Sequence, residues 1–111
     1  MKFHAQVYEV EVGSPFVALH RSEAKGLHEH AFVAIIRVCH APADDPPVDA
    51  DVLAERLREV TAALDGRDLE DVVGCGTAEA LADHLARAMG PCQVRVEVDG
   101  GPSRGGWAVQ R

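Results

Sequence analysis

The sequence has few cysteines, and their spacing matches neither a disulfide framework nor a thiolate metal site. Cys39, Cys75 and Cys92 are three in number, and no two of them form a C-x-x-C pair. An odd set without that spacing argues against disulfide cross-linking and against a zinc knuckle built from thiolates. We therefore expect the thiols to stay reduced and to serve mainly as small buried side chains.

Long apolar runs and clusters of basic residues are also missing. No apolar run approaches the roughly 20 residues needed to cross a bilayer, and the N-terminal segment is not a basic stretch followed by an apolar one. The formal net charge is -7, and the basic residues are scattered along the chain, which disfavours binding to a nucleic-acid backbone. We expect a soluble, cytoplasmic protein that binds neither membrane nor nucleic acid.

The length of 111 residues fits a single domain spanning residues 1–111. A domain of this size buries only about two-thirds of the surface that its unfolded chain exposes, so its core is modest. Association with further copies of the chain would bury more surface, and we expect a homo-oligomer.

Strands are predicted in the first forty residues. Apolar and polar residues roughly alternate over residues 3–12, and a slip in that alternation at residues 8–9 suggests a bulge. Gly, Ser and Pro at residues 13–15 interrupt the pattern before a further extended stretch at residues 16–20. The first strand should therefore be broken or bent. A nearly continuous apolar run rich in β-branched residues predicts a second strand over residues 27–40.

Two helices are predicted in the middle of the chain. Residues 41–47, rich in proline and aspartate, form a loop, and Asp49 then follows as a plausible N-cap. Apolar residues at helical spacing predict an amphipathic helix over residues 50–64. A second helix is expected over residues 77–89, because Thr77 is a good N-cap and Gly90 with Pro91 is a stop signal.

The remaining residues predict two short strands, over residues 93–98 and 106–110, joined by a turn-rich stretch at residues 99–105. The order of elements is then ββααββ, without internal repeats. This order is typical of an α+β domain rather than of alternating βαβ units.

Histidines near the junction of the first two strands have the spacing of a metal site. His28 and His30 are two apart on one strand, so both imidazoles leave the same face. A hairpin with its loop at residues 21–27 would bring His20 beside them. Three neutral nitrogen ligands with an open fourth position are typical of catalytic zinc, which would act as a Lewis acid. Alternatively, His28 and His30 are solvated strand residues and His20 caps a turn.

The whole pattern resembles the family of 6-pyruvoyltetrahydropterin and 6-carboxytetrahydropterin synthases. The stretch Phe16-Val17-Ala18-Leu19-His20 is similar to its F-x-A-x-H motif, and His28-Glu29-His30 is similar to its H-G-H motif. The resemblance covers roughly residues 16–109. It implies the tunnelling fold (T-fold), in which an antiparallel sheet carries two helices on one face and joins an oligomeric barrel, commonly a trimer or a hexamer. It also implies Zn²⁺ on His20, His28 and His30.

Substrate-binding residues are implied in the same way. Residues 74–81 (GCGTAEAL) resemble the family's P-T-x-E-N segment, and residues 94–97 (VRVE) resemble the strand whose glutamate anchors the pterin. The resemblance makes Glu97 the candidate anchor, with Thr77 and Glu79 as lesser candidates. Without it, Glu97 would be read as a solvent-facing strand residue.

The sequence departs from the family at catalytic positions. The family's catalytic cysteine corresponds to Ala24, and the histidine of its L-D-H motif corresponds to Gly66, so that only Asp65 of the Cys-Asp-His relay is kept. Glu23, one position from the lost cysteine, can act as a general base, although a solvated loop glutamate is the simpler interpretation. Cys75, on the loop before the second helix, is not an obvious replacement.

These observations favour a diverged zinc-dependent lyase or cyclase that acts on a small oxygenated molecule, either pterin-like or a specialised metabolite. Few cations lie near the candidate site, which favours an unphosphorylated substrate; they are Arg21, Lys25, Arg67 and Arg104. One alternative is a non-catalytic zinc-containing protein that binds a ligand or a partner. Another is an ordinary pterin-pathway lyase with substitute catalytic residues.

Overall fold

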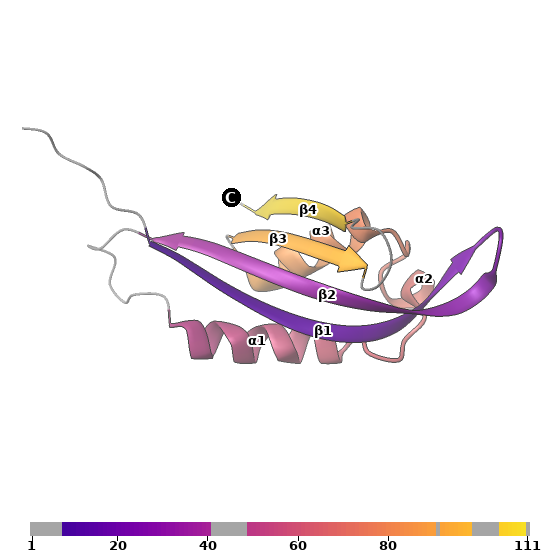
Figure 1. Ribbon diagram of the computed structural model, residues 1–111, viewed down its shortest axis with the longest axis horizontal. Helices are drawn as coiled ribbons and strands as arrows, with labels where there is room; N and C mark the ends of the chain where they lie inside the picture. Colours follow the sequence, from indigo (N-terminus) through magenta and orange to yellow (C-terminus); the bar gives the residue numbers. More distant parts are fainter. Residues whose placement is uncertain (1–7, 41–48, 91, 99–104, 111) are drawn as a thin grey trace, which may run out of the picture.

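A computed structural model describes residues 8–40, 49–90, 92–98 and 105–110. Its four-stranded antiparallel sheet has the strand order β1-β2-β3-β4, and helices α1 and α3 lie on one face of that sheet (Figure 1). The strands are β1 (Tyr8–Ser22), β2 (Gly26–His40), β3 (Cys92–Val98) and β4 (Gly105–Gln110), and the helices are α1 (Ala50–Ala62), α2 (Leu69–Val72) and α3 (Ala78–Met89). The predicted α+β class and ββααββ order are confirmed, with the short α2 as an addition.

The first strand is continuous, so the predicted break at residues 13–15 is wrong. Pairing with β2 runs without an inserted residue from Tyr8 opposite His40 to Ser22 opposite Gly26. The bulge predicted at residues 8–9 is therefore absent from the described pairs, and β1 is instead a long curved strand (Figure 1). Pro15 is tolerated because β1 is an edge strand, where a missing N–H costs no ladder hydrogen bond if it faces outward.

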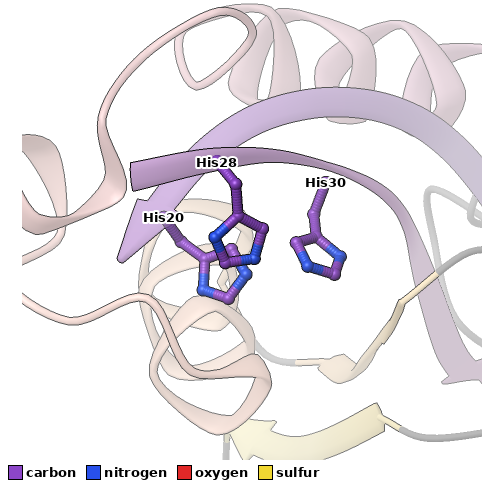
Figure 2. A group of neighbouring side chains, drawn as sticks. All are labelled: His20, His28 and His30. Atoms are coloured by element: carbon purple, nitrogen blue, oxygen red, sulfur yellow. The ribbon is translucent and has the colours of Figure 1, made fainter. Parts of the chain in front are cut away.

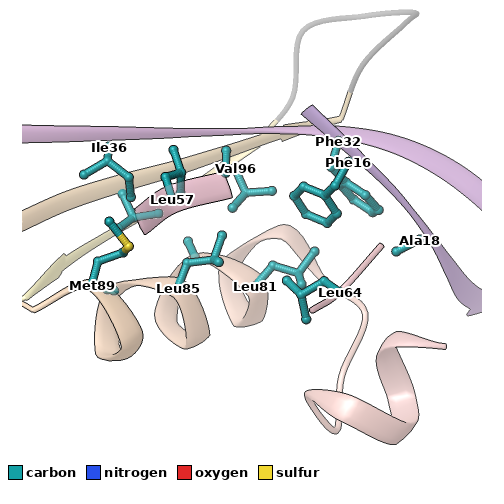
Figure 3. Packing of buried hydrophobic residues seen from close by; sticks show 14 of the residues in the cluster. Phe16, Ala18, Phe32, Ile36, Leu57, Leu64, Leu81, Leu85, Met89 and Val96 are labelled. Carbon is teal, nitrogen blue, oxygen red and sulfur yellow. The ribbon is translucent and has the colours of Figure 1, made fainter. Parts of the chain in front are cut away.

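Alternate residues of the strands point towards the helices and form the core. On β1 and β2 these are the even-numbered positions, including Phe16, Phe32 and Ile36, and they meet Leu81 and Leu85 from α3 (Figure 3). This alternation follows from the two-residue period of a strand. It places His20, His28 and His30, which are also even-numbered, on the helix-covered face.

The helix ends follow the predicted capping signals. Asp49 accepts hydrogen bonds from the backbone N–H groups of Asp51 and Val52 at the start of α1, and Thr77 accepts one from Ala80 at the start of α3. Gly90 ends α3 with a φ of 90°, which a glycine adopts without strain. None of the helices in the described ranges is long and apolar enough to cross a membrane. The predicted loop at residues 41–47, the start of the first strand and most of the turn before β4 lie outside the described residues.

The segment between α1 and α2 covers the outer edge of β1. The Asp65 Oδ1 atom accepts a hydrogen bond of 2.9 Å from the Val17 N–H, and the Gly66 N–H donates one of 2.7 Å to the Val17 carbonyl. Two residues further along, the Leu19 N–H donates to the Arg67 carbonyl at 2.9 Å. These bonds satisfy edge groups that would otherwise be open to pairing, and they bring α2 and the following loop beside the end of β1 that carries His20.

Candidate metal centre

Three histidine rings converge at the hairpin end of the sheet. His20 on β1 lies directly opposite His28 on β2, and His30 follows two residues later on the same face (Figure 2). The ring centroids are 4.2, 4.4 and 4.6 Å apart, and one nitrogen of each ring lies within 4.8 Å of the others. The structure therefore brings together the three residues that the sequence predicts as metal ligands.

The donor set fits a metal ion such as zinc. The Nδ1 atom of His28 lies 2.9 Å from the Gly26 carbonyl oxygen, which can only accept, so this nitrogen donates. The other nitrogen of the neutral ring, Nε2, then keeps its lone pair for a metal, and the bond fixes the orientation of the ring. Gly26 has a φ of 65°, in the left-handed region that glycine adopts without strain. Imidazole groups suit zinc, and three of them leave a fourth coordination position for a substrate oxygen.

The histidines open into a cavity of about 570 Å³, a volume suited to a small molecule. Its first wall is the β1–β2 hairpin, its second is the segment from Cys75 to Glu79 with Glu70, and the ends of β3 and β4 close a third side. The lining residues are His20, Arg21, Ser22, Ala24, Lys25, His28, His30, Phe32, Glu70, Cys75, Gly76, Thr77, Ala78, Glu79, Val98 and Gly105.

Two glycines let the second wall approach closely. A Cβ atom added to Gly76 would lie 2.9 Å from the Cβ of His20, and one added to Gly106 would lie 2.7 Å from the backbone nitrogen of Glu79. Both distances are shorter than ordinary contacts between heavy atoms. The position of the second wall relative to the three histidines therefore depends on having no side chain at these two places.

Thr77 and Glu79, the lesser substrate-binding candidates, do line the cavity with the histidines. The Thr77 hydroxyl accepts a hydrogen bond of 3.2 Å from the Ala80 N–H, so it is committed to capping α3. The Glu79 side chain belongs to an exposed residue in the first turn of α3. Of the two, Glu79 is the better placed to accept hydrogen bonds from a ligand.

Glu97, Asp65 and Glu23 do not line the cavity of their own chain. Glu97 alternates with the buried Val96, so it lies on the helix-free face, where the Arg95 guanidinium donates to it at 2.7 Å. The Asp65 carboxylate is bound to the backbone of β1, and Glu23 lies at the exposed tip of the β1–β2 hairpin. Their predicted roles in substrate binding and catalysis therefore remain predictions.

A thiol and a carboxylate in the cavity, those of Cys75 and Glu70, were not among the predicted site residues. Cys75 is exposed there, and its thiol donates to the Thr77 hydroxyl at 3.6 Å, while Glu70 reaches the cavity from α2. A usable signal for Cys75 was present, because it precedes the predicted N-cap Thr77 by only two residues. Glu70 had no such signal, since its place depends on how α2 packs beside β1.

An ion pair stands at the rim of the cavity. The Arg21 guanidinium donates to the Asp68 carboxylate at 2.9 Å. This hydrogen bond raises the pKa of Arg21 and lowers the pKa of Asp68, whose side chain is only 14% exposed. Asp71 and Glu70 also raise the pKa of Arg21 through their negative charge. The surroundings of Arg21 are thus predominantly negative.

Comparison with solved structures finds the same fold in an enzyme. The structure of 6-pyruvoyl tetrahydropterin synthase from Caenorhabditis elegans matches with a TM-score of 0.70 and 17% sequence identity, over 94% of this chain and 97% of that chain. At this identity the likeness establishes the fold alone, and the predicted tunnelling fold is confirmed. No protein-family model matches the sequence, and no curated protein matches it.

Proposed function

We propose that this chain is a zinc-dependent lyase or cyclase that acts on a small oxygenated molecule, pterin-like or a specialised metabolite. The observation that carries the proposal is the convergence of His20, His28 and His30 at one wall of a cavity of small-molecule size. Such an arrangement, with several titratable side chains converging on one cavity, is typical of catalytic sites. The fold shared with a pterin synthase supports the reaction class by analogy.

A bound zinc ion would supply Lewis-acid polarisation of a substrate carbonyl or hydroxyl. The protein's own residues supply the rest of the chemistry. His28 is oriented by the Gly26 carbonyl, and Phe32 and Val98 form apolar surface beside the histidines that excludes water from the substrate. The thiolate form of Cys75 and the Glu79 carboxylate, on the opposite wall, can accept a proton from a substrate carbon or hydroxyl and return it later in the reaction.

The roles of Glu97, Asp65 and Glu23 are proposed to depend on a homo-oligomer, a trimer or a hexamer. Because Glu97 and Asp65 lie away from the cavity of their own chain, they can act only on a substrate held by a neighbouring copy. Glu97 would anchor that substrate, and Asp65 or Glu23 would assist proton transfer. Light scattering on the purified protein tests this arrangement, and a monomer at micromolar concentration would contradict it.

The second candidate function is a non-catalytic zinc protein that binds a ligand or a partner. One observation favours it: Ala24, at the position where the resemblance places a catalytic cysteine, lines the cavity and offers no ionisable group. An enzyme and a binding protein differ in turnover but share the metal, so metal content and turnover must be measured on the same preparation.

The experiment compares the wild type with His28→Ala and with His84→Ala as a matched control. His84 is a half-buried histidine on α3 that does not line the cavity. We expect one zinc ion per chain in the wild type and in His84→Ala, and its loss in His28→Ala. Turnover is assayed with dihydroneopterin and dihydroneopterin triphosphate, and loss of a measured turnover in His28→Ala alone supports the enzyme. A wild type that purifies and reconstitutes without metal would refute the proposal.

A further inference from the structure

The cavity offers little positive charge to a ligand. Apart from the histidines, Arg21 and Lys25 are the cationic side chains that line it within the described ranges. Lys25 lies on the exposed hairpin turn, and Arg21 is held by Asp68 at 2.9 Å. Phosphorylated substrates are usually gripped by several donors at once, with arginine binding two oxygens through its planar fork. Among the described residues that line the cavity, Lys25 is then the cationic side chain without an ion pair to a carboxylate.

Negative charge surrounds the same cavity. Glu70 and Glu79 line it. Asp68 stands at its rim and, of the neighbouring carboxylates, acts most strongly on Arg21. The start of α3, which would otherwise attract an anion through its N–H groups and helix dipole, is already occupied in two ways. Thr77 accepts the Ala80 N–H, and Glu79 places a negative charge in the first turn. Among the described side chains, a polyanion entering the metal-free cavity would therefore meet more carboxylates than cations.

We infer that Asp68, by holding Arg21, makes this cavity reject phosphorylated and other polyanionic molecules and restricts it to small molecules that are uncharged or cationic and carry N–H or O–H donors. Glu70 and Glu79 supply the acceptors for those donors. The inference deepens the proposed function by naming the class of substrate, and it rests on that function only in treating the bound molecule as a substrate. The inference concerns the charges of the protein's own side chains, and a bound zinc ion would add its positive charge to them.

Asp68 acts here as a specificity-determining residue because it removes the arginine that a phosphate would need. Its carboxylate bonds both to Arg21 and, through the other oxygen, to the Glu70 N–H at 3.1 Å, where it caps α2. Asparagine is an equally good N-cap, so Asp68→Asn keeps the cap while it removes the charge. The guanidinium is then available to an anion.

The test uses pyrophosphate as the anion probe and calorimetric titration at low salt, because surface charge is screened at high salt. Wild type, Asp68→Asn, Glu70→Gln and Asp83→Asn are compared in metal-free form, because a bound zinc ion would itself attract the anion. Asp83 is the matched control, since it is an exposed aspartate on α3 that pairs with Arg87 at 3.1 Å and does not line the cavity. Circular dichroism checks that each variant is folded.

We expect no pyrophosphate binding by the metal-free wild type up to about 1 mM, and a dissociation constant for Asp68→Asn that is lower by on the order of tenfold or more, as expected for removal of one nearby charge. Glu70→Gln should gain affinity in the same direction, and Asp83→Asn should not. Micromolar binding by the metal-free wild type, or no gain in either Asp68→Asn or Glu70→Gln, would overturn the inference. The proposed function is tested separately, and it would be refuted if the wild type held no zinc after incubation with the metal.

Discussion

Gly76→Ala should weaken metal binding without unfolding the protein. Gly76 lies in the loop that faces His20, and a Cβ atom added there would lie 2.9 Å from the Cβ and 3.6 Å from the Cγ of that histidine. The backbone of Gly76 does not have a positive φ, so alanine brings no conformational strain of its own. The perturbation is therefore a local push of one side chain against a metal ligand.

The size of the effect follows from that distance. Carbon atoms pack at about 3.5 to 4.0 Å, so His20 or the loop must move apart by roughly 0.5 to 1 Å. Metal–ligand distances tolerate only about ±0.2 Å, and disturbing groups that hold a ligand typically costs about 10- to 100-fold in metal affinity. We expect the zinc dissociation constant of Gly76→Ala to rise by about that factor.

The assay is competitive zinc titration against a chromophoric chelator, together with thermal unfolding of the metal-free protein. Gly13→Ala is the matched control, because a Cβ at Gly13 would meet the Ala34 carbonyl oxygen at an ordinary 3.6 Å. The control should bind zinc as tightly as the wild type. Unchanged zinc affinity in Gly76→Ala would refute the reasoning, as would an equal loss of affinity in Gly13→Ala.

Three further outcomes are expected. Cys75→Ala should lower turnover by about 10²- to 10⁴-fold with zinc content unchanged, if the thiol transfers a proton; equal turnover in single-turnover assays would exclude that role. Because the pKa of Asp68 is lowered in the folded state, its ion pair with Arg21 stabilises the fold above about pH 4 and loses this effect as pH falls further. Urea unfolding should then show Asp68→Asn less stable than wild type at pH 7, with a smaller difference near pH 3, and a constant difference would contradict this. Ser14 and Thr61 share a buried hydrogen bond of 2.8 Å, so Thr61→Val should cost about 1 to 3 kcal/mol in unfolding free energy by leaving the Ser14 hydroxyl unsatisfied. Adding Ser14→Ala should recover part of that loss.

Local signals in the sequence were sufficient for most of the fold. The N-caps Asp49 and Thr77 and the stop at Gly90 act through nearest neighbours, so α1 and α3 were predictable. The effect of Pro15 was not, because a proline breaks a central strand but is harmless on an edge, and the strand order is a property of the whole sheet. The helix α2 is four residues long, too short to show a helical period.

The two-residue period of a strand explains both why the histidine cluster was predictable and why Glu97 lies away from it. Because the side chains of a strand alternate between its two faces, His28 and His30 had to share one face. The register of the hairpin, in which His20 pairs with His28, then brings His20 beside them. The same alternation, applied to Val96 and Glu97, puts the glutamate on the side opposite the buried valine. Its predicted role came from motif resemblance and stays a prediction, while the strand period places Val98 on the cavity wall.

The lack of an ionisable group at Ala24 does not by itself argue against the proposed catalysis. Ala24 and Cys75 line the same cavity from different walls, the first on the hairpin that carries the three histidines and the second before α3. A proton-transfer group needs only to reach the reacting atom, and its position in the sequence is immaterial. A thiol on the second wall approaches the substrate from another direction, so the bond that is protonated or deprotonated need not be the one used when the thiol lies on the hairpin. Under the proposed function, proton transfer from Cys75 would come from the second wall, and the acidic surroundings of Arg21 favour a substrate without phosphate groups.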